Sequence, residues 1–112
     1  MTLYLCRMDV DLPADLPDAT REDLLRREAE YSGGYQRDGI WVELWRVVGA
    51  YANYSVFDVV DNDALHSILS GLPLYPYMRI DVTPLARHPN RIDVPGLAGT
   101  MHRTTSNEGV KP

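Results

Sequence analysis

The hydrophobic and polar positions of this chain follow two periods, one typical of strands and one of helices. Residues 3–10 are apolar on both faces, which predicts a buried strand, and two X-Pro pairs break it. A helix is expected from about residue 18 or 20 to residue 38, and Thr20 with Asp23 three residues later is a weak cap signal. Gly39 is suited to end this helix.

The second half of the pattern repeats this plan. Strands are expected at residues 40–48 and 51–59, with a tight connection at Gly49-Ala50. A helix follows from about residue 61 to Gly71, and a last strand covers residues 78–82. The order β-α-β-β-α-β predicts an α+β, ferredoxin-like fold, in which two helices cover one face of a four-stranded antiparallel sheet.

The chain of 112 residues has the length of one domain. We assign this domain to residues 1–92. Residues 93–112 hold glycines, prolines and scattered polar residues, so we expect a C-terminal arm or a disordered tail there.

Both faces of the predicted sheet are largely apolar, although a two-layer fold leaves one face open to water. In the second strand, Trp41, Glu43 and Trp45 are expected to point one way, and Leu44 and Arg46 the other. We therefore expect the open face to pack on another subunit of a homo-oligomer. The alternative is that the C-terminal segment folds across it.

Composition excludes several classes of function. A net charge of −5 argues against a nucleic-acid partner, and no apolar run is long enough to span a membrane. The N-terminus lacks the features of a signal peptide, and the lone Cys6 cannot form an internal disulfide, so a cytoplasmic location is expected. The spacings of His66, His88 and His102 match no metal site, so we expect no bound metal, and no phosphate-binding glycine loop is present.

Glu28 is the first candidate for chemistry. It lies on one helical stripe with Leu24, Tyr31 and Tyr35, which places a carboxylate on an apolar face. Burial there would raise its pKa, as a proton-shuttling base near neutral pH requires. Alternatively, Glu28 lies at the edge of the stripe and reaches water or an arginine. The Gly33-Gly34 pair in the same helix indicates a bend, a close approach of another backbone, or room for a ligand.

Polar residues within the third strand form the second candidate. Tyr51, Asn53 and Ser55 are spaced by two and share one face of an otherwise apolar strand. In an apolar pocket, Tyr51 and Asn53 could bind a carbonyl on which negative charge develops. The alternative is a buried polar pair that neighbouring main chain satisfies.

The chain resembles the muconolactone isomerase family over roughly residues 3–92. The matching segments are Gly39 with Trp41, Leu44-Trp45-Arg46, the string YANYSVFDV at 51–59, Ala64-Leu65-His66, LPLYPYM at 72–78 and Arg87-His88-Pro89. The resemblance implies a cofactor-free homodecamer with pockets between subunits. The implied reaction moves the ring double bond of (+)-muconolactone to give 3-oxoadipate enol-lactone, in the catechol branch of the β-ketoadipate pathway.

The resemblance also implies roles for individual residues. Glu28 would remove the proton at C4 of the lactone and return a proton at C2, while Tyr51 and Asn53 would hydrogen-bond the lactone carbonyl of the dienolate. Ser32, Tyr54 and Trp41 are further candidates for substrate binding. The Gly33-Gly34 pair departs from the family pattern and leaves the width of the pocket open.

Other functions remain compatible with the sequence. One is 5-chloromuconolactone dehalogenase of the same family. Another is a non-catalytic, ferredoxin-like module that binds a small ligand, in which Glu28 would face solvent. A third is a dimeric α/β-barrel monooxygenase, against which the lack of a well-placed histidine weighs. Arg7, Arg46, Arg79 and His88 are all candidates to bind the carboxylate of the substrate.

Overall fold

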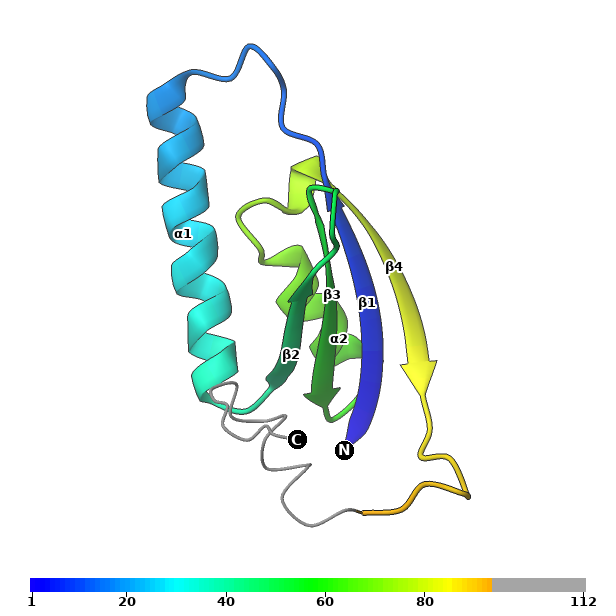
Figure 1. Ribbon diagram of the computed structural model, residues 1–112. Coiled ribbons are helices and arrows are strands. Elements are labelled where there is room, and N and C mark those ends of the chain that lie inside the picture. The colour runs from blue at the N-terminus through cyan, green and yellow to red at the C-terminus, as the bar shows by residue number, and fades with distance from the viewer. Residues whose placement is uncertain (94–112) are drawn as a thin grey trace, which may run out of the picture.

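The computed structural model describes residues 1–93, and Figure 1 shows their arrangement. Its elements are β1 (Thr2–Val10), α1 (Asp18–Arg37), β2 (Trp41–Arg46), β3 (Ala52–Val59), α2 (Asn62–Ser70), the short 3-10 helix η1 (Tyr75–Tyr77) and β4 (Met78–Leu85). The predicted order of elements is confirmed. The tail predicted at residues 93–112 lies outside the described residues, apart from its first residue.

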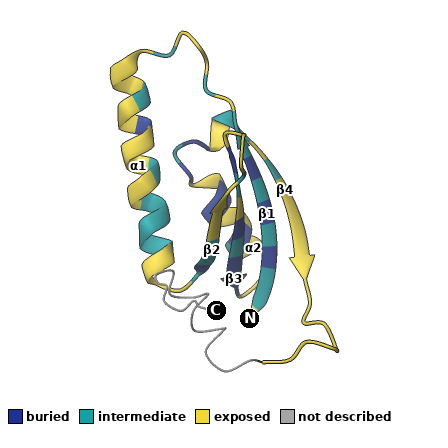
Figure 2. Cartoon of the chain, viewed as in Figure 1, coloured by how far each residue is buried: buried dark blue, intermediate teal, exposed yellow. Residues whose placement is uncertain are grey.

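The strands form one antiparallel sheet in the order β2-β3-β1-β4. In Figure 1, α2 lies behind this sheet and α1 runs beside its β2 edge. Side chains of β1 and β3 form a core with α2, and Tyr31 and Tyr35 of α1 pack against the same core. Figure 2 shows that buried residues concentrate on β1 and β3, whereas β4 is mostly exposed. The ferredoxin-like prediction is therefore confirmed.

The ends of the helices follow the sequence in part. Gly39 has φ +75°, a conformation that glycine adopts without strain, as its expected place after α1 requires. Asp61 caps α2, since its side chain accepts a hydrogen bond from the Ala64 N–H. The cap predicted at Thr20 is wrong, because α1 begins at Asp18 after Pro17, without a side-chain cap.

A β-bulge changes the faces of β2. The register shifts between Trp41 and Glu43, so Trp41 pairs with Phe57 whereas Trp45 pairs with Tyr54. Phe57 and Tyr54 point to opposite faces of β3, and the two tryptophans therefore do so too. The prediction that Trp41 and Trp45 share a face was wrong, because strict alternation does not hold across an inserted residue.

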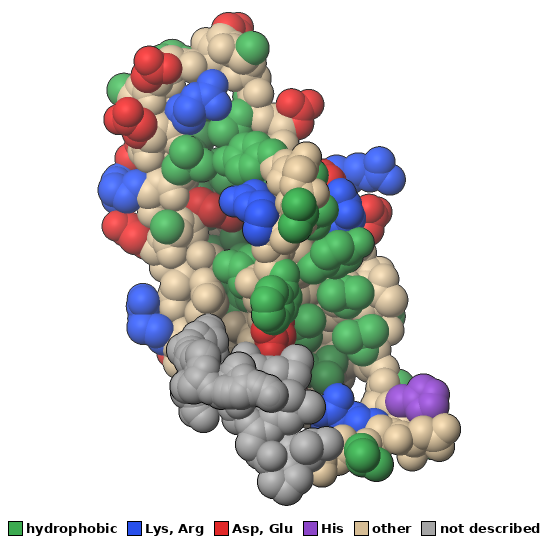
Figure 3. Space-filling view, viewed as in Figure 1, with side chains coloured by type: hydrophobic (Ala, Val, Ile, Leu, Met, Phe, Trp, Pro, Cys, Tyr) green, Lys and Arg blue, Asp and Glu red, His purple; other side chains and the backbone are tan. Residues whose placement is uncertain are grey.

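The face of the sheet opposite the helices exposes apolar side chains. Trp45 of β2 is 59% exposed there, Tyr54 is exposed on the adjacent β3, and Leu85 is exposed on β4 at the other edge. Figure 3 views the sheet from this side and shows hydrophobic side chains gathered over it. Charged pairs occupy part of the same face, since Arg7 binds Asp9 at 2.9 Å. Within residues 1–93, no helix combines the length and apolar character needed to cross a bilayer.

Candidate active site

The apolar stripe of α1 places Glu28 beside the segment that follows α2. Leu24 is buried, and Tyr31 packs against the core one turn beyond Glu28. On the outer side of the helix, Arg26 pairs with Asp23 and Glu30 in water. The side chains of α1 therefore separate as the sequence predicts, and Glu28 falls on the inner side.

The Glu28 carboxylate is half-buried and held by the main chain. Its Oε1 accepts a hydrogen bond of 3.0 Å from the backbone N–H of Leu74, a buried residue just before η1. Burial raises the pKa of Glu28 above its ordinary value, and the Leu74 N–H acts in the opposite direction by stabilising the charged form. No other hydrogen bond to Glu28 is formed within residues 1–93, so Oε2 is available to accept a proton there.

Tyr31 fixes α1 to the end of α2 next to this carboxylate. Its hydroxyl donates to the Ile68 carbonyl at 2.7 Å, and burial raises the pKa of Tyr31 to about 12. A Cβ at Gly71 would collide with the Tyr31 hydroxyl, so the close approach of the phenol requires a glycine there. This contact fixes the position of Glu28, one helical turn away on the same stripe.

Asn53 and Ser55 of β3 lie on the helix side of the sheet. Asn53 pairs in register with Met8 of β1, a fully buried residue, and its Oδ1 accepts a bond of 2.7 Å from the Ser55 hydroxyl. This satisfies the carboxamide oxygen and leaves the Asn53 amide group free to donate, since no described residue accepts from it. No direct hydrogen bond joins Glu28 to Asn53 in the described chain.

Tyr51 lies just before β3, at the end of the turn from β2. Its carbonyl accepts from the Val10 N–H at 3.0 Å, while its ring is 46% exposed. The guanidinium carbon of Arg46 lies 5.5 Å from the centroid of the Tyr51 ring. Arg46 is also the register partner of Asn53. Arg46, Tyr51 and Asn53 therefore form one group at the end of the β2–β3 hairpin.

The structure does not bring the other predicted residues into this group. Ser32 is partly buried on α1, and its hydroxyl donates back to the Ala29 carbonyl. Tyr54 lies on the opposite face of the sheet, where its hydroxyl accepts from Arg7. Trp41 is buried against Phe57, and its indole N–H has no partner among residues 1–93.

One participant could not be found from the pattern of side chains. The Leu74 N–H orients Glu28, but residue type does not indicate such a donor, because every residue except proline carries a backbone N–H. The string LPLYPYM at 72–78 contains Leu74 and belongs to the segments that resemble the family, but it does not indicate the role of this backbone donor. Within residues 1–93, no group of three or more His, Cys, Asp or Glu side chains is arranged to hold a metal ion.

The fold and these residues define a ferredoxin-like α+β protein that carries a half-buried acid and a hydrogen-bonded asparagine on the helix side of its sheet. A family model, muconolactone delta-isomerase, matches residues 2–91. The chain belongs to the muconolactone delta-isomerase family.

Individual relatives agree with this assignment. The muconolactone delta-isomerase of Cupriavidus pinatubonensis (strain JMP 134 / LMG 1197) is 59% identical over 90 residues, which cover 80% of this chain and 98% of that protein. Muconolactone delta-isomerase 1 of Acinetobacter lwoffii is 52% identical, over 80% of this chain and 94% of the relative. The crystal structure of muconolactone isomerase at 3.3 Å resolution superposes with a TM-score of 0.79 at 48% identity, covering 82% of this chain and 96% of that one.

Proposed function

We propose that this protein is an intramolecular isomerase that moves the ring double bond of (+)-muconolactone to give 3-oxoadipate enol-lactone. The observation that carries the proposal is Glu28, a half-buried acid with a raised pKa in a chain of this family. Under the alternative of a ligand-binding module, Glu28 would face solvent, whereas here it binds the Leu74 N–H. The relatives are named as isomerases, so we do not favour the dehalogenase alternative.

In the proposed mechanism, Glu28 moves the proton. The carboxylate takes the proton from C4 of the lactone, and the resulting acid returns a proton to C2. Desolvation makes the carboxylate a stronger base than an exposed one, and the bond from Leu74 to Oε1 leaves Oε2 as the atom that accepts the proton. Because its pKa is raised toward neutral, Glu28 can both remove the proton at C4 and return a proton at C2.

Tyr51 and Asn53 are the proposed stabilisers of the dienolate. Negative charge develops on the lactone oxygen once the proton has left C4. The Tyr51 hydroxyl and the Asn53 amide group would donate to this oxygen, and the bond from Ser55 to the Asn53 Oδ1 holds the carboxamide oxygen and leaves the amide group to donate. Donors of this kind are commonly worth about 3–4 kcal/mol of transition-state stabilisation each.

The remaining site residues complete the proposal. Ser32 and Trp41 would line the lactone pocket, on the helix side of the sheet. Tyr54 lies on the other face, so it would reach a lactone only across an interface between subunits. This agrees with a homodecamer that has pockets between its subunits, as the apolar open face supports. We place the enzyme in the cytoplasm, where the lone, buried Cys6 would stay reduced.

The experiment that tests this function is ultraviolet-monitored turnover of (+)-muconolactone by Glu28→Gln. Loss of a general base typically costs 10²–10⁴-fold, and we expect a loss of about that size in kcat. Glu30→Gln is the matched control, because Glu30 lies on the outer side of the same helix and pairs only with Arg26. Near-normal turnover by Glu28→Gln, with the fold intact by circular dichroism, would refute the role of Glu28.

A further inference from the structure

We propose that Arg46 binds the carboxylate of the substrate's acetate arm and so orients the lactone ring over Tyr51 and Asn53. This inference rests on the proposed function, since it assigns a residue to the anionic end of that substrate. Its basis is the position of Arg46 on β2, beside both proposed dienolate donors and without a carboxylate partner among residues 1–93.

The first observation is the position of the guanidinium. Arg46 pairs with Asn53 in the β2–β3 ladder, so the two side chains leave the sheet on the same face. The guanidinium also lies over the Tyr51 ring, at 5.5 Å from its centroid. A carboxylate bound to Arg46 would therefore keep a small lactone within reach of both residues.

The second observation is the bulge that gives Arg46 this direction. The positions of Trp41 and Arg46 differ by an odd number, so in a regular strand their side chains would point to opposite faces. The irregularity between Trp41 and Glu43 lets β2 bury Trp41 in the core and still present Arg46 on the same side. Bulges commonly redirect a side chain next to a functional site.

The third observation separates Arg46 from the other cations that the sequence left open. Arg7 is bound to Asp9 on the opposite face of the sheet, and this contact raises the pKa of its guanidinium. Arg79 lies on that opposite face too, 3.8 Å from Asp81, with 82% of its side chain exposed. His88 lies in the loop beyond β4, where its Nδ1 accepts from the Asn90 N–H.

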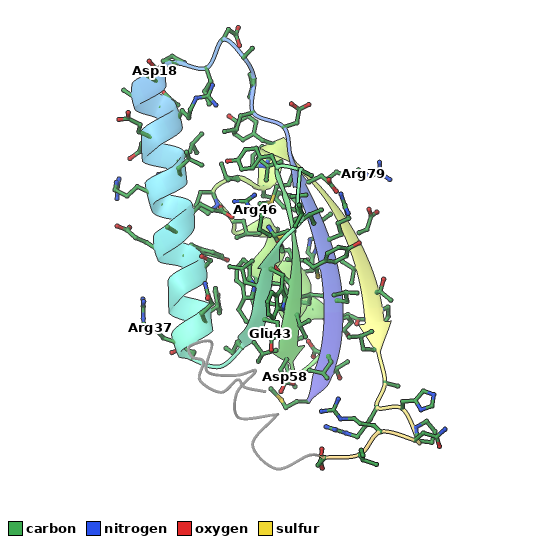
Figure 4. The ribbon with its side chains drawn as sticks, viewed as in Figure 1. Asp18, Arg37, Glu43, Arg46, Asp58 and Arg79 are labelled. Carbon is green, nitrogen blue, oxygen red and sulfur yellow. The ribbon has the colours of Figure 1, made fainter. Side chains whose placement is uncertain are left out.

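Arg46 differs from these three in its electrostatic state. No Asp or Glu of residues 1–93 lies within 4.0 Å of its guanidinium, so its charge is not neutralised by a partner in the described chain. Figure 4 shows Arg46 between α1 and the sheet, whereas Arg79 extends from the far edge of the sheet. In a protein with a net charge of −5, an anionic substrate needs such a local cation to offset general repulsion.

The test compares (+)-muconolactone with its methyl ester, in which the acetate arm carries no charge. A hydrogen-bonded charge pair contributes about 1.5–3 kcal/mol, so we expect Arg46→Gln to lower kcat/KM for the acid by about 10- to 150-fold. For the ester we expect a change of less than about 3-fold, because the guanidinium has no anion to bind there. Arg46→Lys keeps the charge without the fork geometry of the guanidinium. Its kcat/KM for the acid is expected to lie between those of the wild type and Arg46→Gln.

Arg79→Gln is the matched control, since it removes one arginine from the other edge strand and the opposite face of the same sheet. It is expected to leave the ratio of acid to ester activity unchanged. Equal losses for acid and ester in Arg46→Gln would leave the ratio of acid to ester activity unchanged and would overturn the proposal, because the arginine would then only support Tyr51. A fall in the ratio of acid to ester activity in Arg79→Gln, in place of Arg46→Gln, would overturn the proposal as well.

Failure of the proposed function would look different in the same assay. If the wild-type protein turns over neither the acid nor the ester, the isomerase assignment is refuted. If the wild type is active and Arg46→Gln keeps the wild-type preference for the acid, only the role of Arg46 is refuted.

Discussion

At the scale of single residues, Glu28 is subject to two opposing influences. Partial burial disfavours the carboxylate and raises its pKa, whereas the Leu74 N–H stabilises the carboxylate and limits the rise. The same N–H also fixes one oxygen in position. A base for carbon acids benefits from both effects, because it must be ionised at the working pH and must point at one proton.

The raised pKa of Glu28 predicts a pH dependence. The rate kcat/KM should rise with pH through an apparent pKa above 4.5, the ordinary value for glutamate, since only the carboxylate accepts the proton. The contribution of Glu28 to the free energy of unfolding should change in the opposite sense and fall as the pH rises. In the window between 4.5 and the raised pKa the folded state retains a proton that the unfolded state releases, so the contribution of Glu28 to stability is lost as the pH rises.

Two measurements check this pH dependence. A pH–rate profile of kcat/KM gives the apparent pKa, and an acid limb at or below 4.5 would contradict the desolvation of Glu28. Urea unfolding of the wild type and of Glu28→Gln at several pH values gives the stability difference. The glutamine variant should gain stability relative to the wild type as the pH rises through the window.

The residues of the site were predictable to different degrees. Glu28 could be found because a carboxylate on an apolar helical stripe departs from the amphipathic pattern, and Asn53 because a carboxamide does the same on a buried strand. The pairing of Arg46 with Asn53 could not be found, because register between strands depends on the turn and on the bulge. Leu74 acts through its backbone, which the sequence does not mark.

At the scale of elements, the order of helices and strands was predictable and the faces of β2 were not. Hydrophobic periodicity and the breaks at proline and glycine located both α-helices and all four strands to within a few residues, but not the short η1. β4 continues to Leu85, beyond the predicted end at residue 82, because Pro84 is tolerated on an edge strand. The bulge in β2 has no such mark in the sequence, and it places Trp41 in the core and Trp45 on the opposite, exposed face.

Gly34 within α1 and Gly71 at the end of α2 differ in what surrounds them, which predicts opposite effects of alanine. A Cβ at Gly34 would meet nothing within 4 Å, so Gly34→Ala should stabilise the chain by about 0.5–1 kcal/mol through the higher helix propensity of alanine. Gly71→Ala should destabilise it by about 1–3 kcal/mol, because the new Cβ displaces Tyr31 from the Ile68 carbonyl.

Thermal and urea unfolding at one protein concentration measure both effects. A loss of stability in Gly34→Ala would show that something outside the described chain, such as a second subunit, packs on this part of α1. Gly71→Ala combined with Tyr31→Phe provides the control. If the hydroxyl is the obstacle, the double variant should lose less than the sum of the two single changes.

At the scale of the whole molecule, the two faces of the sheet differ in what they present. The helix side carries the core, Glu28 and the group around Arg46. The other side exposes apolar residues of β2, β3 and β4, including Trp45, Tyr54 and Leu85, together with charged pairs that include Arg7 with Asp9. A contiguous apolar patch of this kind is typical of an interface between proteins, and we propose that copies of this chain assemble through it.

Trp45→Lys tests this assembly, because the bulge exposes Trp45 on the open face, where 59% of its surface meets solvent. Burying a large apolar side chain contributes about 1.5–3 kcal/mol, and a buried lysine adds a desolvation cost, so each interface should weaken more than tenfold. Light scattering coupled to size exclusion should then show smaller species than the wild type.

Val48→Lys is the control, since Val48 is 97% exposed in the turn between β2 and β3, outside the strands. If Trp45→Lys assembles like the wild type, the open face is not the interface, and the exposed tryptophan needs another partner.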